Sequence, residues 1–132
     1  SYIKGKQVDE FEQALSAFHG EGYVISCANG TDALQAALMA LNLSPEDEVI
    51  TPGFTYIATA EVIALLGLKP VFTEVDPDTF NVDASALKQA ITKRTKAIMV
   101  VHLYGQCADM EPILQIAQEY GIPIIEDNAQ AI

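Results

Sequence analysis

Residues 96–103 read Lys-Ala-Ile-Met-Val-Val-His-Leu, an almost unbroken apolar run rich in strand-forming residues. A strand with one face in water alternates apolar and polar side chains, whereas this run is apolar at every position from Ala97 to Val101. The pattern therefore predicts a strand that is buried on both faces. Strands of this kind are typical of parallel sheets that lie between two layers of helices.

The strand signal recurs on both sides of this run, and a helical pattern separates each strand from the next. Short apolar segments predict further strands at residues 23–28, 48–51, 70–75 and 122–126. Apolar residues at helical spacing predict helices at residues 30–41, 56–66, 83–91 and 109–120, after an earlier helix at residues 8–18. Strand and helix repeat four times before a final strand. Right-handed crossovers then give an α/β fold with an open, doubly wound, mainly parallel sheet.

Composition limits the classes of function that the chain can have. It has 132 residues, and 50% of them are hydrophobic, which excludes a disordered tail. With 7 Lys and Arg against 18 Asp and Glu, the formal net charge is −11, so no nucleic-acid partner is expected. No apolar run approaches the ~18 residues of a membrane span, and no signal peptide pattern is present. From the missing membrane span and signal peptide we expect a cytoplasmic protein with no membrane partner. Cys27 and Cys107 lie far apart, so we expect no disulfide and no metal site.

Ligands of open parallel sheets bind beyond the carboxyl ends of the strands, and the segment at residues 26–32 lies at such an end. It reads Ser-Cys-Ala-Asn-Gly-Thr-Asp and leads into a predicted helix. Free N–H groups at a helix start attract a phosphate, and Gly30 allows close backbone approach. An ordinary helix cap by Asn29 or Thr31 explains the same residues. The segment has neither the GxGxxG nor the P-loop pattern, which disfavours a dinucleotide-binding dehydrogenase or an NTPase.

Aromatic and histidine side chains follow two other predicted strands. Phe54 and Tyr56 come just after the strand at residues 48–51, where one of them can stack on a planar ring, although packing in the core is the commoner fate of an aromatic residue. His102 lies at the end of the central run and is a candidate acid or base, because histidine titrates near neutral pH. A hydrogen-bonded structural histidine is the commoner alternative.

Two adjacent acids, Glu126 and Asp127, follow the last predicted strand. Side chains alternate along a strand, so the two carboxylates are expected to point to opposite sides. A carboxylate at the mouth of an apolar site is costly unless a cation pairs with it, and a protonated pyridine nitrogen is one such partner. A cap on a following helix explains Asp127 equally well.

Four runs, taken together, form a recognisable set. They are residues 25–34 (Ile-Ser-Cys-Ala-Asn-Gly-Thr-Asp-Ala-Leu), 47–56 (Asp-Glu-Val-Ile-Thr-Pro-Gly-Phe-Thr-Tyr), 104–109 (Tyr-Gly-Gln-Cys-Ala-Asp) and 125–130 (Ile-Glu-Asp-Asn-Ala-Gln). The set resembles the DegT/DnrJ/EryC1/StrS family of sugar aminotransferases, with most similarity to enzymes that aminate the 3-keto group of UDP-linked N-acetyl-hexosamine uronates. The resemblance implies pyridoxal 5′-phosphate (PLP) as cofactor, the aspartate aminotransferase fold (fold type I) and a homodimer.

The resemblance also implies roles for individual residues. Gly30 and Thr31, with the amide of Asp32, resemble the phosphate-binding turn of the family. Tyr56 resembles the aromatic residue that stacks on the pyridine ring, and Asp127 resembles the carboxylate that pairs with the ring nitrogen.

Three further positions complete the implied site. Gln130 resembles the partner of the ring's 3-oxygen. His102 falls near the cofactor in the family pattern. Asn128 stands where the family more often has a small residue, next to the implied partner of the ring nitrogen.

The resemblance further implies a Schiff-base lysine and a smaller C-terminal domain, both downstream of Gln130 and outside this chain. None of the lysines of this chain occupies the motif that holds the Schiff-base lysine in the family; they are Lys4, Lys6, Lys69, Lys88, Lys93 and Lys96. We therefore expect residues 1–20 to form an N-terminal helical segment, and residues 21–132 to form part of the PLP-binding large domain. The chain would then hold no catalytic residue and be inactive on its own.

Three functions remain open at this stage. The first is a PLP-dependent aminotransferase that moves an amino group from an amino acid such as glutamate to a keto-sugar nucleotide. The second is a related PLP-dependent 3-dehydratase acting on a 4-keto-6-deoxy sugar, in which histidine replaces the lysine. The third is a non-catalytic cofactor-binding or regulatory fragment.

Overall fold

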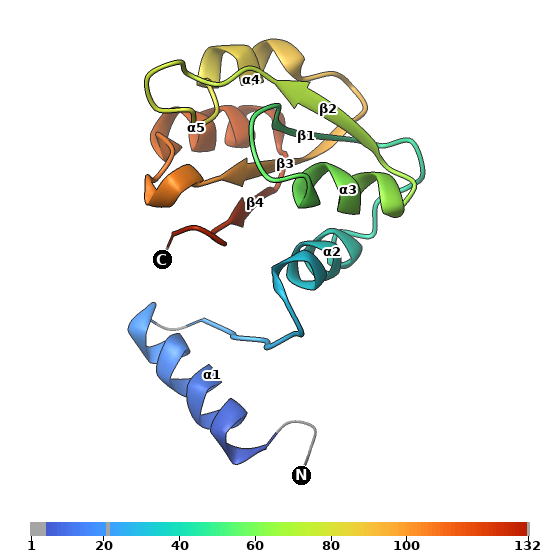
Figure 1. The fold of residues 1–132 in the computed structure, drawn as a ribbon. Coiled ribbons are helices and arrows are strands. Elements are labelled where there is room, and N and C mark those ends of the chain that lie inside the picture. The colour runs from blue at the N-terminus through green and yellow to red at the C-terminus, as the bar shows by residue number, and fades with distance from the viewer. Residues whose placement is uncertain (1–4, 21, 132) are drawn as a thin grey trace.

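The computed structural model describes residues 5–20 and 22–131 and shows an α/β architecture (Figure 1). Its elements follow in the order α1 (Lys6–Phe18), α2 (Gly30–Ala40), β1 (Glu48–Pro52), α3 (Ala58–Leu65), β2 (Lys69–Thr73), α4 (Ala84–Ala90), β3 (Thr95–Val101), a 3₁₀ turn η1 (Leu103–Gly105), α5 (Met110–Tyr120) and β4 (Ile124–Asp127). Lys4 lies outside the described residues. Within the described ranges, no helix has the length and apolar character needed to cross a membrane.

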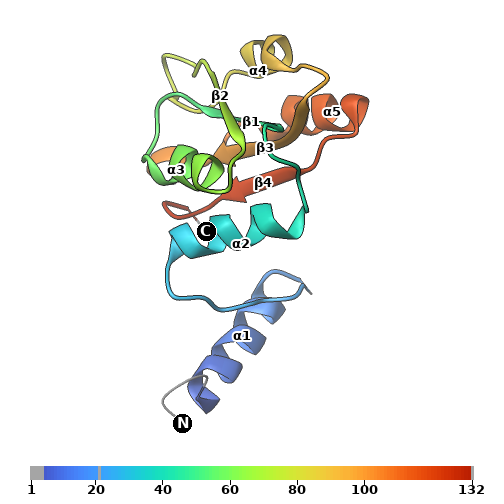
Figure 2. The same cartoon turned by 90° about the vertical axis from the view of Figure 1, so that its right-hand side faces the viewer.

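Four parallel strands form one sheet in the spatial order β2-β1-β3-β4. From β1 the chain passes through α3 to β2 on one side, returns through α4 to β3 on the other side, and continues through α5 to β4. The direction of winding therefore reverses between β1 and β3, which is where open α/β sheets bind ligands beyond the carboxyl ends of their strands. Helices cover both faces of the sheet (Figures 1 and 2). The predicted doubly wound fold class is confirmed.

The central strand β3 lies between two separate apolar cores. On one face Ala97 and Met99 pack with side chains of α2 and α3. On the other face Ile98 and Val100 pack with side chains of α4 and α5. All four are at most 1% exposed, which confirms the prediction made from residues 96–103. Full burial of such side chains contributes ~1.5–3 kcal/mol each and holds the two helical layers on the sheet.

The strand predicted at residues 23–28 does not form. Tyr23 and Ile25 are 103% and 82% exposed, and the segment pairs with no strand of the described sheet. Instead, it links α1 to α2 at a distance from the sheet (Figure 2). The N–H and hydroxyl of Ser26 both donate to one carboxylate oxygen of Glu12 in α1, at 2.9 and 2.7 Å. Apolar residues give a segment the propensity for a strand, but a strand also needs a neighbour to pair with.

Two helix ends have the cap expected from their residue type, and a third does not. Gly121 ends α5 in the left-handed conformation (φ 66°, ψ 36°), and Asp83 caps α4 by accepting the N–H of Ala86 at 2.7 Å. Asp109 stands at the start of α5, but its side chain makes no capping hydrogen bond. Helix α1 forms as predicted, although it has no buried residue and lies apart from the sheet layers (Figures 1 and 2).

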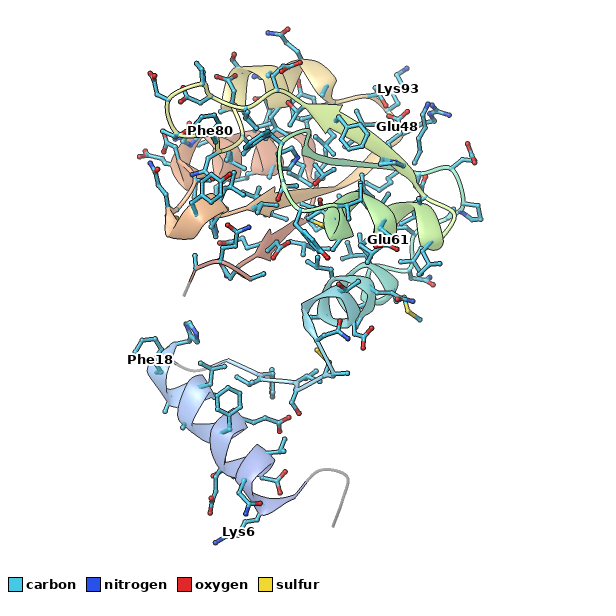
Figure 3. All side chains as sticks on the ribbon, viewed as in Figure 1. Lys6, Phe18, Glu48, Glu61, Phe80 and Lys93 are labelled. Carbon is cyan, nitrogen blue, oxygen red and sulfur yellow. The ribbon has the colours of Figure 1, made fainter. Side chains whose placement is uncertain are left out.

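A buried glutamate ties together the amino ends of three strands. Glu48 begins β1, is 4% exposed, and accepts a hydrogen bond from Arg94 at 2.6 Å. The same oxygen lies 3.8 Å from Nζ of Lys69 at the start of β2, and the other oxygen accepts the hydroxyl of Thr92. The Thr92 hydroxyl, and after it Arg94, hold the pKa of Glu48 below its ordinary value against the opposing effect of burial. Figure 3 shows Glu48 at this end of the sheet and Phe80 on the far side.

Candidate functional site

A cavity of about 330 Å³ opens where the carboxyl ends of β3 and β4 approach the start of α2. Its walls come from that helix start, the β1–α3 connection, the end of β3 and the segment from Asp127 onward: Gly30, Thr31, Leu34, Thr55, Tyr56, Ala58, Val101, Asp127, Ala129 and Gln130. The structure thus brings together five of the six residues expected to bind a cofactor. The sixth, Asp32, does not line the cavity.

The start of α2 is capped by Asn29, whose side chain accepts the N–H of Asp32 at 2.9 Å and donates to its carboxylate at 3.1 Å. The carbonyl of Asn29 accepts the N–H of Ala33. The amide of Asp32 is therefore bonded within the turn, and its role toward a phosphate stays a prediction. In the described part of the chain, the N–H groups of Gly30 and Thr31 have no such partner and remain free to bind an anion.

The backbone at Gly30 has open space where a side chain would be. A Cβ placed there would meet no atom within 4 Å, and the residue is not in the left-handed conformation. Neither the backbone nor the packing around it therefore requires glycine. The added side chain would take up room at the helix start that lines the cavity.

Asp127 lines the cavity, whereas the adjacent Glu126 bonds to a group on the other face of the sheet, so the predicted alternation is confirmed. One oxygen of Asp127 accepts the N–H of Ala129 at 3.0 Å. No cation of the described residues forms an ion pair with this carboxylate. Its neighbour across the strand pair is the apolar Val101. A carboxylate in this setting is suited to pair with a cationic group of a ligand.

His102 is held away from the cavity. It is 3% exposed, its Nδ1 accepts the N–H of Ala108 at 3.0 Å, and its Nε2 lies 3.0 Å from Glu126. Since Nδ1 is an acceptor, the hydrogen-bond pattern assigns the proton to Nε2, which donates to Glu126. His102 does not line the cavity: its ring joins the β3 end to the turn before α5, which matches the alternative of a hydrogen-bonded structural histidine.

Gln130 is fixed by a backbone contact. Its Oε1 accepts the N–H of Tyr104 at 2.7 Å, which leaves its amide nitrogen available as a donor. Gln130 and Tyr56 also line a second cavity of about 320 Å³, together with Gly53, Phe54, Thr55, Leu103 and Tyr104. Gln130, Tyr56 and Thr55 therefore form a wall that both cavities share.

The sequence analysis did not single out three residues that the structure places at or near this wall. Tyr104 supplies the N–H that fixes Gln130. Thr55 lines both cavities, and its hydroxyl is buried without a hydrogen-bond partner. Asn81 lies behind the wall and bonds to the turn that contains Tyr104. Thr55 and Tyr104 lie in two of the runs that resemble the family, and Gly105 is a turn residue beside Tyr104, whereas Asn81 lies in none of these runs.

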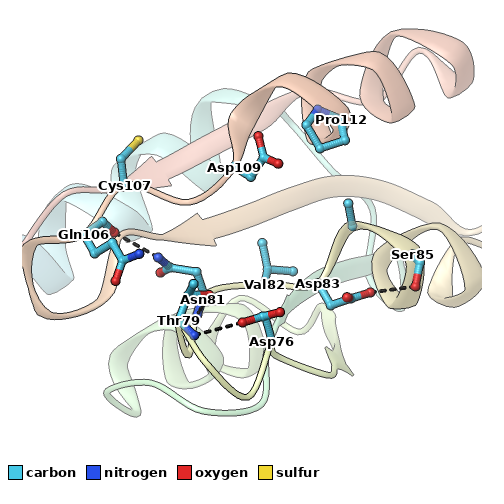
Figure 4. A pocket seen from close by; sticks show the side chains of 11 residues that line it. Asp76, Thr79, Asn81, Val82, Asp83, Ser85, Gln106, Cys107, Asp109 and Pro112 are labelled. Carbon is cyan, nitrogen blue, oxygen red and sulfur yellow. Dashed lines mark hydrogen bonds between the residues drawn. The ribbon is translucent and has the colours of Figure 1, made fainter.

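A third cavity, of about 390 Å³, lies between the starts of α4 and α5 (Figure 4). Its lining is polar and acidic: Asp76, Thr79, Asn81, Val82, Asp83, Ala84, Ser85, Gln106, Cys107, Asp109 and Pro112. Over residues 5–20 and 22–131, no group of His, Cys, Asp and Glu side chains is arranged to hold a metal ion. Two of the acids in this cavity cap local turns: Asp83 caps the start of α4, and Asp76 accepts the N–H groups of residues 78 and 79.

The sequence matches the profile of the DegT/DnrJ/EryC1/StrS aminotransferase family over residues 1–132. The chain belongs to this family. It is 62% identical, over 98% of its length, to UDP-2-acetamido-2-deoxy-3-oxo-D-glucuronate aminotransferase of Pseudomonas aeruginosa, and covers 36% of that relative. It is 49% identical, over 97% of its length, to GDP-perosamine synthase of Caulobacter vibrioides, and covers 34% of it. The chain thus spans about a third of the length of these curated relatives.

Solved structures of the family share this fold. A DegT/DnrJ/EryC1/StrS aminotransferase from Brucella abortus superimposes with a TM-score of 0.94 at 47% identity, covering 98% of this chain and 37% of that one. NtdA from Bacillus subtilis, solved with its cofactor PMP bound, superimposes with a TM-score of 0.94 at 41% identity, covering 98% of this chain and 30% of that one. The predicted fold type I architecture is thereby confirmed.

Proposed function

We propose that residues 1–132 form the cofactor-binding part of a PLP-dependent aminotransferase that transfers the amino group of glutamate to a keto-sugar nucleotide. The observation that carries the proposal is the cavity at the strand ends, which collects free backbone donors, an unpaired carboxylate and an oriented amide. The high identity to the Pseudomonas aeruginosa enzyme favours a UDP-linked 3-oxo-glucuronate as the acceptor.

The start of α2 suits the phosphate of PLP. Gly30 and Thr31 offer N–H groups without partners among the described residues, and the helix dipole adds up to ~2 kcal/mol in a partly buried site. The formal net charge of −11 gives no long-range attraction for an anion, so binding rests on these short-range donors and on groups outside this chain.

The other cavity residues suit the ring of PLP. When bound, PLP supplies an electron-withdrawing ring that stabilises negative charge developing on the substrate. Asp127 would hold the proton on the ring nitrogen, and the amide nitrogen of Gln130 would donate to the 3-oxygen. Tyr56 would lie against the ring face and exclude water from it. The donor set and its polarity therefore fit the group.

We extend this proposal to a homodimer in which the partner subunit completes the site. Tyr56 and Tyr104, which line the two adjoining cavities, are 71% and 72% exposed. Exposed aromatic side chains such as these favour coverage by further protein, either from the rest of the enzyme or from a second copy.

The decisive experiment compares Asp127→Asn with Glu126→Gln in the full-length enzyme. Asp127→Asn removes the charge that faces the cavity and should lower kcat by about 100-fold, the scale of losing one preorganised electrostatic partner. Glu126→Gln removes the adjacent charge on the other face and should leave kcat within about twofold, since it touches no ligand. Transfer of ¹⁵N from labelled glutamate to the keto-sugar nucleotide is the readout. Equal effects of the two variants, or no transfer by the unsubstituted enzyme, would reject the proposal.

A further inference from the structure

A buried asparagine holds both ends of the turn that contacts Gln130. Asn81, in the connection between β2 and α4, is 4% exposed. Its Oδ1 accepts the N–H of Leu103 at 3.0 Å, and its Nδ2 donates to the carbonyl of Gln106 at 3.0 Å (Figure 4). One side chain thus closes residues 103–106 into a clamped turn.

The clamped turn holds a backbone conformation that L-residues rarely adopt. Tyr104 has a φ of 57° and Gly105 a φ of 81°. This conformation directs the N–H of Tyr104 to Oε1 of Gln130 at 2.7 Å. A Cβ at position 105 would lie 3.3 Å from the carbonyl oxygen of Gln130, so the turn touches both its side chain and its backbone. A left-handed tyrosine persists only where the surroundings determine it, and the two bonds from Asn81 do so here.

The contact decides which end of the Gln130 amide faces the ligand. Because Oε1 is occupied by a donor, the NH₂ group is the end left to face the cavity. We propose that Asn81 is a positioning residue of the cofactor site, which acts through residues 103–106 to keep Gln130 a hydrogen-bond donor toward an acceptor oxygen of the ligand. This inference rests on the proposed function, in which that oxygen belongs to PLP.

The first test is a double-mutant cycle in the full-length enzyme, with PLP affinity as readout. Asn81→Ala should weaken PLP binding by about 3- to 10-fold, the equivalent of one hydrogen bond. In a Gln130→Ala background the same substitution should have no further effect, because the donor that it orients is gone. Hydrogen exchange by mass spectrometry should show faster exchange in a peptide covering residues 103–107 of the Asn81→Ala protein.

The second test approaches the turn through an exposed residue, so that it does not depend on a core substitution. Gly105→Ala places a Cβ against the carbonyl of Gln130 and should weaken PLP binding to a similar degree. Gly121→Ala is the matched control: Gly121 also has a positive φ, 66°, but its Cβ would meet no atom within 4 Å. The control should lower the melting temperature as much as Gly105→Ala does, yet keep PLP affinity within about twofold.

Each outcome decides between the two proposals. If the unsubstituted enzyme binds PLP but the Asn81 and Gln130 effects are additive, or if Gly121→Ala weakens binding as much as Gly105→Ala, the positioning role is wrong and the proposed function stands. If the unsubstituted enzyme binds no PLP, the proposed function fails and this inference fails with it.

Discussion

Nε2 of His102 lies 3.0 Å from a carboxylate oxygen of Glu126, with the imidazole ring buried at the ends of β3 and β4. The residues beside them in sequence, Val101 and Asp127, line the cavity on the opposite face. One pair of neighbouring strand ends therefore does two things. On one face it bonds the sheet to the turn before α5, and on the other face it lines the ligand cavity.

This arrangement predicts that His102→Ala affects stability rather than ligand binding. The substitution leaves the N–H of Ala108 and the carboxylate of Glu126 without their partner, which should lower the free energy of unfolding by about 1–3 kcal/mol. PLP affinity of the folded enzyme should change by less than about twofold, because His102 does not line the cavity. Urea unfolding and a PLP titration measure the two quantities. Weaker PLP binding at unchanged stability would show that the ring acts on the ligand.

Gly30→Val should weaken PLP binding at least about tenfold, because the branched side chain fills space at the helix start where two free N–H groups meet the cavity. Asp32→Asn is the companion variant. Its amide stays bonded to Asn29 and its side chain can still accept from it, so affinity should change less than about twofold. Fluorescence titration of both full-length variants provides the dissociation constants. A larger effect at Asp32 would mean that its carboxylate has a role in the site.

Glu48 makes the stability of the protein depend on pH in a definite direction. Its folded-state pKa lies below the ordinary value of 4.5, with the Thr92 hydroxyl as the main cause and Arg94 as the next favourable one. The stabilisation that the Glu48 carboxylate contributes to the folded protein is therefore complete above its ordinary pKa of 4.5. It is lost as pH falls through the lower pKa that Glu48 has in the folded state. Glu48→Gln should have a lower melting temperature at pH 7, and the difference from the unsubstituted protein should shrink in acid.

The proposed homodimer is tested by light scattering. Several large apolar side chains outside the sheet layers are exposed, among them Phe18 at 72%, Tyr23 at 103% and Ile25 at 82%. Surfaces of this kind favour association. Multi-angle light scattering of the full-length enzyme should give twice the monomer mass at micromolar concentration. A monodisperse monomer over the whole concentration range would contradict the dimer.

Much of the fold could be predicted because its signals are local. The unbroken apolar run of β3 predicted burial on both faces, and the structure shows that burial. The segment at residues 23–28 carried the same apolar signal but formed no strand, because pairing depends on which segments the tertiary structure places beside it. No local pattern contains that information.

The candidate site, like the fold, was predictable where its signals were local. The segments that hold Tyr56 and Asp127 were identified because the carboxyl ends of parallel strands meet at one edge of the sheet, and the resemblance to the family pointed to these two residues, which do line one cavity. For His102 the sequence left a catalytic and a structural role open, because the direction of the ring depends on the N–H of Ala108, which approaches only after the chain has turned. The link from Asn81 to Gln130 was missed for the same reason. It joins three connections that are distant in sequence and requires a left-handed Tyr104.

The strand order has a consequence for how the protein folds during its synthesis on the ribosome. Strand β1 pairs with β2 after a short βα connection, but the other edge of β1 stays open until β3 has been made, and β4 is the last of these four strands to be made. Parallel pairings of this range close late, because the intervening chain must be ordered before they form. Gly30 and Thr31 are made before the four strands of the described sheet, whereas Asp127 ends β4 and Gln130 follows it. The cavity therefore joins segments from either side of this sheet in sequence, and no ligand can bind to a complete site before all four strands have been made and paired.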